Sequence, residues 1–470
     1  MIGESDVVVI GCGPAGISAA TTSAALGLRV LLLDEQAAPG GQIYRGITSV
    51  PAALAEKLGP DYRHGRTLSD ALATSSVRVL HGAPVWDVDA DLNVAYLHDG
   101  AARQVRTGHL IVATGAIERA TPVPGWTLPG VMYAGAAQLL LKTAASIPAG
   151  RVALAGNGPL LLLVANQLRE AGADVTALVE TTRLSDLIGA APHLPRALGA
   201  VEYLAKGLAM MRALRGSRTR WVRGAEAMRV IGDERVRALQ ARVAGKTITI
   251  EADTVLLHFG VIPNTQLTRL MRLEHRWNEA QQAWQPQCDA WGRTSHPRVT
   301  VAGDGAGIGG ARVAESGGVI AALDAARALG KLTEAELEQR AAPPRAEIRR
   351  HLRIRPLLDA AYAPPPWITN PPDETIVCRC EEVTAGEIRS MTRIGCRGPN
   401  QTKFFSRCGM GPCQGRVCGP TVAAILAREN RLSPEEVGYY RIRPPLKPLP
   451  LAALAALADT SATPEPTDTA

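Results

Sequence analysis

The sequence predicts an α/β protein with two parallel, doubly wound sheets and a small cysteine-rich domain toward its C-terminal end. The stretch "DVVVIGCGPAGISAATTSAALGLRVLLLDE" has the order strand, glycine turn, helix, strand, and residues 151–181 repeat that order. Six of the eight cysteines lie in "CRCEEVTAGEIRSMTRIGCRGPNQTKFFSRCGMGPCQGRVC". Strands that alternate with helices build parallel sheets. Clustered cysteines in a reducing compartment favour a metal or redox site over structural disulfides.

The composition is that of a folded protein with more than one domain. With 470 residues, 46% hydrophobic and 20% charged, the chain exceeds what one hydrophobic core supports. The net charge of +7 comes from scattered arginines, and the basic run "RRHLRIR" is interpreted as a solvated helix face, so we expect no nucleic-acid partner. No apolar run is long enough to span a bilayer and no signal peptide is found. We therefore expect a cytoplasmic protein without a membrane span, which leaves peripheral membrane contact open.

The first glycine turn has the spacing of a nucleotide-binding loop. Gly11, Gly13 and Gly16 form G-x-G-x-x-G between an apolar strand and a helix. The first glycine permits a tight turn, the second lets the backbone approach a pyrophosphate, and the third allows close helix–strand packing. Asp34 closes the following strand, where an acid can bind a ribose hydroxyl, and Glu35 is the alternative acid.

Three later segments extend this pattern. "HLIVATGAIERATPVPGW" predicts a strand that ends in a glycine turn, "DTVLLHFGVIPNTQL" a further strand, and "RVTVAGDGAGIGGARVAESGG" a strand, turn and helix. Four markers in this order, "GCGPAG", "GGQ", "ATGA" and "VAGD", resemble the flavoproteins with two dinucleotide-binding domains of the glutathione and thioredoxin reductase type. The resemblance covers residues 1–330.

That resemblance implies FAD in the first domain. In that family the acid of the last motif bonds the ribityl chain of the flavin, and the ATG turn approaches the cofactor. Carried onto this chain, the implied FAD contacts are Gly11, Gly13, Pro14, Ala15, Gly16, Asp34, Glu35, Gly41, Gln42, Thr114, Gly115, Gly303 and Asp304.

The second glycine turn departs from the pattern. In "GNGPLL", Gly156 and Gly158 are present, but Leu161 stands where the third glycine is expected and would push helix and strand apart. Glu180 ends the next strand, where an acid suits NAD and repels the 2′-phosphate of NADP. We favour an inherited fold that no longer binds a dinucleotide over NAD(H) binding.

No catalytic residue is predicted. The chain lacks the active disulfide of the reductases, and Cys12 and Cys288 are isolated cysteines that packing explains. No His, Ser or Cys constellation suggests acid–base or nucleophilic catalysis. Disulfide reduction is therefore disfavoured.

The clustered cysteines have the spacing of an iron–sulfur module. Cys378 and Cys380 form C-x-C, and Cys413 and Cys418 form C-x₄-C after 32 intervening residues. Four thiolates can hold an iron–sulfur cluster, and thiolate-rich sites also suit zinc. "CRCEEVT…GMGPCQGRVC" resembles the [2Fe-2S] module named for bacterioferritin-associated ferredoxin, which implies these four cysteines as ligands. Cys408 is the competing ligand, through its own C-x₄-C spacing to Cys413.

The motifs divide the chain into five parts. These are an FAD-binding domain at residues 1–120 and 255–330, a second dinucleotide-type domain at 121–254, a helix and Pro-rich linker at 331–373, a [2Fe-2S] domain at 374–430, and a C-terminal extension at 431–470. The tail "DTSATPEPTDTA" has too little apolar content to pack, so we expect it to be disordered.

The order of these parts resembles the flavoprotein A subunits of heteromeric amino-acid and opine dehydrogenases, a group with opine oxidase, D-hydroxyproline or proline dehydrogenase and hydrogen cyanide synthase. "ATGAIERATPVPGWTLPGVMYAGAAQ" also resembles that group. The resemblance implies an electron-transfer subunit that serves oxidation of the C–N bond of an opine, proline or related secondary amine. It further implies a second flavoprotein subunit of the amino-acid oxidase type, with a small third subunit as an option, and a quinone or other electron acceptor. Two alternatives stay open: an NADH-dependent ferredoxin-type reductase, and a flavin-bearing scaffold that docks or delivers iron.

Overall fold

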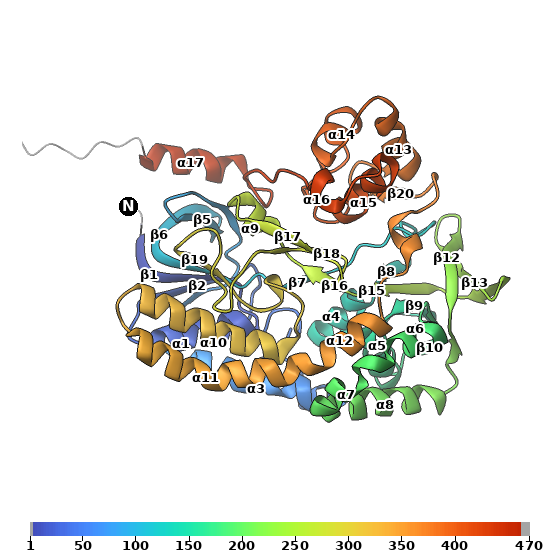
Figure 1. Ribbon diagram of the computed structural model, residues 1–470, viewed down its shortest axis with the longest axis horizontal. Helices are drawn as coiled ribbons and strands as arrows, with labels where there is room; N and C mark the ends of the chain where they lie inside the picture. Colours follow the sequence, from blue (N-terminus) through green and yellow to red (C-terminus); the bar gives the residue numbers. More distant parts are fainter. Residues whose placement is uncertain (1–2, 462–470) are drawn as a thin grey trace, which may run out of the picture.

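The computed structural model describes residues 3–461, which form two α/β units and a helical cysteine module (Figure 1). The units lie side by side, and in this view the module, in orange-red, lies above the region where they meet. The end of the tail for which we expect disorder, residues 462–470, lies outside the described residues. Among residues 3–461, no helix combines the length and the apolar content needed to cross a membrane.

The first unit is built on a seven-stranded sheet whose core is parallel, as the sequence predicts. Its strands in order are β3 (Arg78–Leu80), β2 (Val30–Leu33), β1 (Gly3–Ile10), β6 (Ala101–Val112), β5 (Asn93–His98) and β4 (Val85–Val88), with β19 (Val299–Val301) paired to β6. Residues 7–10 of β1 lie beside residues 30–33 of β2. Both runs are continuously apolar because helices or loops cover both faces of a parallel sheet.

Three helices form a layer against one face of this sheet (Figure 1). α1 (Pro14–Ala25) packs on α10 (Ala311–Ala328), and α11 (Glu334–His351) packs on α10 in turn. A Cβ atom on Gly318 would lie 2.1 Å from the carbonyl oxygen of Ala15, so this helix contact requires glycine. The nucleotide loop and the last helix of the unit are therefore fixed to each other.

The second unit repeats the architecture with five parallel strands. Their order is β11 (Arg220–Val222), β10 (Asp174–Glu180), β9 (Arg151–Asn157), β15 (Thr254–Phe259) and β8 (Val131–Tyr133). Because β15 pairs with β9 and β8, the boundary expected between residues 254 and 255 falls too early. The buried run "TVLLHF" suits either sheet, and only the pairing assigns it to the second.

Shorter elements complete the two units. An antiparallel sheet extends from the second unit and consists of β12 (Ala225–Gly232), β13 (Val236–Val243) and β14 (Lys246–Glu251). Two strand pairs lie near the junction of the units. They are β7 (Ala116–Glu118) with β16 (Val261–Pro263), and β17 (His275–Asn278) with β18 (Ala283–Pro286). The remaining helices of the units are α2 (Ala52–Leu58), α3 (Pro60–Ala73), α4 (Ala134–Ala144), α5 (Pro159–Glu170), α6 (Leu184–Ala190), α7 (Leu194–Ala197), α8 (Val201–Arg215) and α9 (Gln266–Leu270).

The segment after the first unit has helices followed by a Pro-rich connection, as expected. Helices α11 and α12 (Arg355–Ala361) occupy its charged part, and the Pro-rich part departs from an extended linker only in a short 3₁₀ turn at Pro366–Thr369. Thr333 caps α11: its hydroxyl accepts the amide of Glu336 at 3.3 Å, and the Glu336 carboxylate accepts the Thr333 amide at 2.9 Å. This reciprocal pair satisfies two otherwise unpaired helix-end donors.

The cysteine module has a hairpin and a small set of helices. These are β20 (Ile376–Cys378), β21 (Val383–Thr384), α13 (Ala385–Arg393), α14 (Pro399–Ser406), α15 (Gly419–Asn430) and α16 (Pro434–Val437), with α17 (Leu451–Ser461) beyond. Helices α13 and α15 confirm the helical patterns in "TAGEIRSM" and "PTVAAILAREN". The core of the module is continuous with one face of the first sheet, since Val422 and Tyr440 belong to the same apolar cluster as Val8. The module is therefore packed on the first unit.

Candidate functional site

The three loop glycines differ in what surrounds them. A Cβ on Gly11 would lie 2.4 Å from the carbonyl oxygen of Ala113, and one on Gly16 would lie 1.7 Å from that of Gly11. A Cβ on Gly13 would meet only the Cα of Gly41, at 3.8 Å. The first and third glycines are thus needed for packing, whereas the second leaves open space beside the start of α1. This is the arrangement that lets a pyrophosphate approach the backbone.

Asp34 faces this loop, and Glu35 faces away from it. The buried Asp34 carboxylate accepts the amides of Cys12 and, at 2.6 Å, of Gln36, and its burial raises its pKa. The Glu35 carboxylate instead forms a 2.6 Å salt bridge with Lys447 of the C-terminal extension. Of the two acids that the sequence offers, the geometry favours Asp34.

Asp304 holds the two glycines that precede α10. One oxygen of its carboxylate accepts the amides of Gly309 and Gly310, each at 2.9 Å, and burial raises its pKa. Gly303 has φ +71°, and a Cβ there would lie 2.7 Å from the Cβ of Ala15. The "AGD" turn is therefore locked against the first glycine loop.

The remaining predicted contacts complete one edge of the first sheet. Thr114 donates its hydroxyl to the carbonyl of Asn264 at 3.3 Å, and the Asn264 amide donates to the carbonyl of Gly115 at 2.9 Å. Gln42 is exposed beside Gly41, whose φ is +59°. The predicted residues follow the carboxyl ends of β1, β2, β6 and β19, and "GGQ" lies against the β1 loop. Carboxyl ends of parallel strands are where such sheets bind nucleotides, so these residues fit FAD.

Lys142 is a site residue that the sequence reasoning missed. It lies on α4 with 4% of its surface exposed, and its ammonium donates to the carbonyls of Gln42 and Ile43 at 3.4 and 2.9 Å and to Oε1 of Gln138 at 2.9 Å. Burial lowers the pKa of Lys142 to about 7. Lys142 therefore holds the "GGQ" turn in place without a carboxylate partner. Its only sequence signal is a lysine on the apolar face of "AAQLLLKTA".

The second glycine turn lies on the wall of a cavity between the two units, since Asn157 and Gly158 line it. The Glu180 carboxylate accepts from Nε1 of Trp221 at 2.6 Å and pairs with Arg223 at 3.4 Å, both through Oε2. The side-chain amide of Asn157 donates to the carbonyls of Tyr362 and Ala363, both at 3.2 Å. The segment after α12 thus crosses the end of β9. That this domain no longer binds a dinucleotide stays a prediction.

A cavity of about 1180 Å³ lies between the two units. On its wall, Nδ1 of His258 lies 2.6 Å from the carboxylate of Glu118, which also accepts the amide of Gly135 at 3.0 Å. Arg119, with 6% exposed, donates only to backbone carbonyls, those of residues 259, 281 and 282, and burial lowers its pKa to about 10. Sequence reasoning missed this His–Glu pair because its members lie 140 positions apart.

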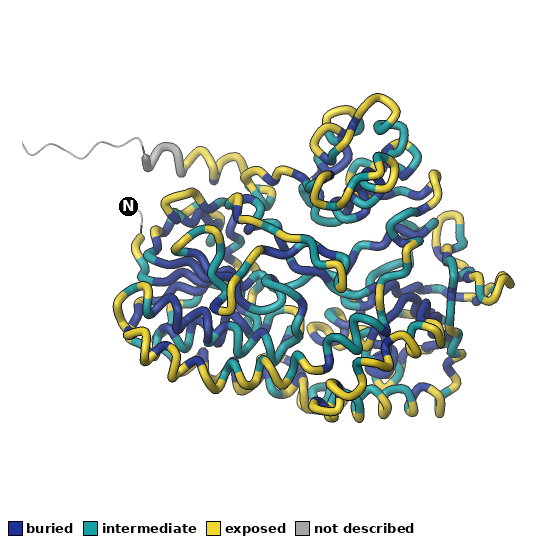
Figure 2. Tube along the Cα trace, viewed as in Figure 1, coloured by how far each residue is buried: buried dark blue, intermediate teal, exposed yellow. Residues whose placement is uncertain are grey.

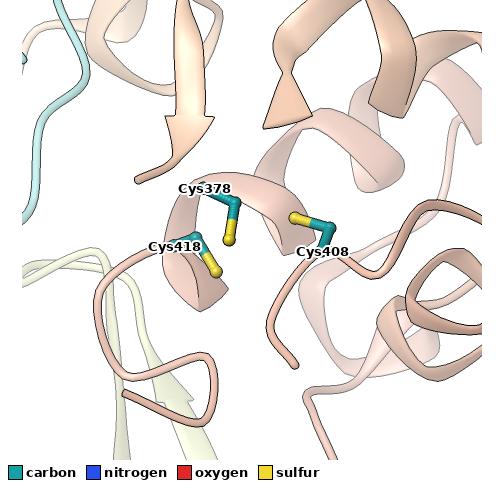
Figure 3. Close-up of side chains that lie close together, drawn as sticks. All are labelled: Cys378, Cys408 and Cys418. Atoms are coloured by element: carbon teal, nitrogen blue, oxygen red, sulfur yellow. The ribbon is translucent and has the colours of Figure 1, made fainter. Parts of the chain in front are cut away.

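Three of the predicted cysteines meet in the module (Figure 3). The sulfurs of Cys378, Cys408 and Cys418 lie within 4.8 Å of one another, and all three residues are buried. Cys378 ends β20, Cys408 follows α14, and Cys418 precedes α15. Hydrogen bonds from the other two thiols lower the pKa of Cys378 to about 2. The amide of Gly409 also points at the Cys378 sulfur, at 3.5 Å.

The other two candidate ligands form a neighbouring pair. Partial burial raises the pKa of Cys380, and the charges of Cys413 and Cys378 raise it further. A hydrogen bond from the backbone of Cys413 acts in the opposite direction. Cys396 is buried outside these groups, against Thr402. The structure thus groups Cys378 with Cys408 and Cys418 and pairs Cys380 with Cys413. Neither of the two predicted ligand sets lies together as a whole, and which four cysteines bind stays a prediction. A donor set of only thiolates fits an iron–sulfur centre.

Two family models match this chain, one over its two α/β units and one over its cysteine module and C-terminal extension. Residues 5–330 match the family described as pyridine nucleotide-disulphide oxidoreductase, and residues 373–458 match the sarcosine oxidase A3 domain. The A subunit of opine oxidase from Agrobacterium tumefaciens (strain Ach5) is 44% identical over 97% of this chain and 92% of its own length. The corresponding opine oxidase protein of Rhizobium meliloti is 42% identical over 97% and 88%. Hydrogen cyanide synthase subunit HcnB of Pseudomonas protegens is 33% identical over 95% and 96%.

Solved structures agree on the fold. The crystal structure of L-proline dehydrogenase from P. horikoshii matches 97% of this chain and 80% of its own chain, with TM-score 0.67 and 17% identity. The T. acidophilum thioredoxin reductase matches 68% of this chain and 97% of its own, with TM-score 0.50 and 20% identity. At such identities the likeness concerns the fold alone. The sequence matches carry the assignment: the chain belongs to the family of the opine oxidase A subunits, within the pyridine nucleotide-disulphide oxidoreductases, and is a flavin-dependent oxidoreductase.

Proposed function

We propose that this chain is the FAD- and [2Fe-2S]-containing electron-transfer subunit of a heteromeric dehydrogenase or oxidase. Its complex oxidises the C–N bond of an opine, proline, hydroxyproline or related secondary amine and passes the electrons to a quinone or another acceptor. A second flavoprotein subunit of the amino-acid oxidase type carries out the oxidation of the amine, and a small third subunit completes some assemblies.

The observation that carries the proposal is the packing of a six-cysteine module on a nucleotide-binding sheet, in a chain 44% identical to the A subunit of an opine oxidase. When bound, a flavin accepts an electron pair and can release electrons singly, and a [2Fe-2S] cluster carries them one at a time. Gly13, Asp34 and Asp304 would hold the FAD. Cys378, Cys380, Cys413 and Cys418, with Cys408 as the alternative, would hold the cluster.

The chain's own residues prepare these positions. The loop glycines expose backbone N–H groups at the start of α1, and Lys142 fixes the "GGQ" turn. The apolar cluster that the module shares with one face of the first sheet supports the cysteine loops. No group in the cavity is assigned to amine oxidation, because the proposal places that step on the partner subunit. The His258–Glu118 pair remains without an assigned step.

The test is reconstitution with candidate partner subunits. The chain is purified alone and with the products of neighbouring genes, and each preparation is screened with opines, proline and hydroxyproline against a dye acceptor. Amine-dependent dye reduction is expected only from the complex. Steady reduction by the isolated chain would contradict the proposed division of labour, and a complex inactive with every secondary amine would contradict the substrate class.

A further inference from the structure

Residues 183–223 form an exposed segment that is both apolar and basic, which we name the α6–α8 segment. It spans α6, α7, α8 and β11 on the outer side of the second unit, and Figure 2 colours much of α7 and α8 as exposed. Seven of the fifteen large hydrophobic side chains exposed in residues 3–461 lie within it: Leu184, Leu187, Ile188, Leu194, Leu198, Val201 and Leu208. The most exposed is Leu184, at 72%.

The spacing of these side chains is helical. Leu184, Leu187 and Ile188 stand at i, i+3 and i+4 on α6, and the later residues recur at intervals of three, four or seven positions from Leu194 to Leu208. Such a period normally buries its apolar face against a core. Here the structure leaves it uncovered, so the segment has an apolar stripe without a partner in the part of the chain that the structure describes.

Positive charge is concentrated in the same segment. It holds eight basic and two acidic residues, a net charge of +6 against +7 for the whole chain. Lys206 pairs with Asp61 and Arg223 with Glu180. Within residues 3–461, six exposed arginines of the segment form no salt bridge: Arg183, Arg196, Arg212, Arg215, Arg218 and Arg220.

We propose that the α6–α8 segment binds the surface of an anionic lipid bilayer, with its leucines in the interface and its arginines on the headgroups. On α8, Arg212 and Arg215 stand at i+4 and i+7 from Leu208, so exposed apolar and basic side chains share one face. Binding at a membrane interface grows with the apolar area buried in it and with the attraction between basic side chains and anionic lipids. A second copy of this chain would bring two +6 surfaces together. A protein partner is disfavoured because binding hot spots are rich in Trp, Tyr and Arg and poor in Leu, whereas the exposed apolar residues here are aliphatic.

The segment also reaches the cavity between the units. Leu187, Leu194 and Met210 line that cavity as well as belonging to the α6–α8 segment. A lipid-soluble acceptor dissolved in the bilayer would therefore meet the cavity wall at the membrane surface. This extension rests on the proposed function, but lipid binding itself rests on the surface residues alone.

The experiment is flotation of the full-length protein with vesicles, which needs no activity. One set of vesicles is phosphatidylcholine and the other is phosphatidylcholine mixed with phosphatidylglycerol. We expect binding to the mixed vesicles at low salt, weaker binding at high salt because screening shortens the reach of the charges, and little binding to phosphatidylcholine alone. Binding that is independent of lipid charge and of salt would overturn the proposal.

Two variants and two matched controls locate the contact. Arg212→Glu with Arg215→Glu should weaken binding by about twenty-five-fold or more, since each basic side chain near an anionic surface contributes about a factor of five. Ile188→Asp with Leu198→Asp should abolish it. The controls change equally exposed residues elsewhere: Arg103→Glu with Arg106→Glu on β6, and Phe404→Asp with Phe405→Asp on α14. Both controls should bind as the wild type does.

Other occupants give different results. If the wild type ignores mixed vesicles but forms a dimer that Ile188→Asp with Leu198→Asp dissociates in light scattering, the face belongs to a second copy and the proposal fails. If those variants lose only a co-purifying protein of the complex, the face belongs to that protein and the proposal also fails. Circular dichroism and flavin content, unchanged in all four variants, show that the fold is intact. Failure here leaves the reconstitution test of the proposed function unaffected.

Discussion

Asp304 is a single carboxylate that serves the fold and the proposed cofactor together. One of its oxygens accepts the amides of Gly309 and Gly310 at the entry to α10. The amides of a helix N-terminus favour a negative charge, which offsets part of the cost of burying this carboxylate. Its other oxygen is the one left for a ribityl hydroxyl in the proposed FAD site.

We predict that Asp304→Ala purifies with much less flavin than the wild type. A hydrogen bond to a charged group contributes about 1.5–3 kcal/mol, which corresponds to roughly a tenfold to hundredfold weaker retention. The flavin-to-protein absorbance ratio measures it. Asp304→Asn keeps an acceptor for the two glycine amides and serves as the control for folding. Equal flavin content in Asp304→Ala and wild type would remove Asp304 from the proposed site.

Cysteine substitutions separate the two ligand sets. We predict that Cys418→Ser loses the visible absorption and the reduced-state paramagnetic signal of the cluster, whereas Cys408→Ser keeps both, because four thiolates suffice. Cys396→Ser is the matched control, since Cys396 is buried outside the sulfur group. The reverse result would make Cys408 the ligand beside Cys378 and would leave the iron–sulfur proposal standing.

Lys142 predicts a pH dependence of stability. Its folded-state pKa is about 7 because it is buried, against 10.5 as the ordinary value. Between these values the unfolded chain binds the proton and the folded chain does not, so stability rises with pH across this window and is flat below it. The slope is at most about 1.4 kcal/mol per pH unit.

Urea unfolding of wild type and Lys142→Met measures this effect. The difference between their free energies of unfolding should move in favour of the wild type as pH increases from about 7 toward 10.5. A difference that does not change with pH would mean that Lys142 keeps its proton in the folded state. Lys142→Arg, which keeps the charge, should lack the slope.

At the scale of elements, the second β–α–β unit keeps its fold, and two polar side chains at its strand ends are held by the chain itself. The Asn157 amide is held by the segment after α12, and the Glu180 carboxylate by Trp221 and Arg223. Leu161, fully buried at the start of α5, adds bulk where a glycine would let helix and strand approach.

We therefore predict that NADH neither binds tightly nor bleaches the flavin. An anaerobic titration of the purified chain with NADH, followed by flavin absorbance, should show no change, because Leu161 takes the place of the third glycine and Trp221 and Arg223 hold Oε2 of Glu180. Dithionite added to the same sample should bleach the flavin and prove that it is reducible. Rapid bleaching by stoichiometric NADH would favour the NADH-dependent reductase instead.

At the scale of the whole molecule, the C-terminal extension ties the cysteine module to the first unit. Arg272 donates to the carbonyl of Ile442 at 2.9 Å, the amide of Leu446 donates to the carbonyl of Trp86 at 2.9 Å, and Lys447 pairs with Glu35. On the other side, Nε1 of Trp126 donates to the carbonyl of Ile376 at 2.6 Å. Contacts at both ends hold the module in one position.

We predict that a chain ending at Arg443 keeps its flavin but frees the module. The truncation removes Leu446 and Lys447 while retaining Tyr440 and Ile442 in the core of the module. Limited proteolysis should then cut faster in residues 362–373, the connection before the module, and release a fragment. Unchanged cleavage would mean that the shared apolar core alone fixes the module.

Much of the fold followed from local patterns. Apolar runs with glycine turns identified β1, α1, β9 and α5, because a buried parallel strand must be apolar on both faces. The cofactor residues were found because close backbone approach demands glycine at fixed spacing, as the contacts of Gly11 and Gly16 show. Residues that meet only in the folded chain were not predicted. Glu118 and His258, which lie 140 positions apart, are an example.

The sequence by itself determined the two dinucleotide folds and the cysteine-rich module, since each depends on short-range spacing. It also narrowed the acid at the end of β2 to two neighbouring residues, Asp34 and Glu35. Only the tertiary structure decided that Asp34 and not Glu35 faces the loop, that β15 belongs to the second sheet, and that Cys408 and Cys418 both lie beside Cys378. The physical reason is that strand pairing, sulfur contacts and ion pairs depend on which distant segments pack together. A single sequence does not specify that packing locally.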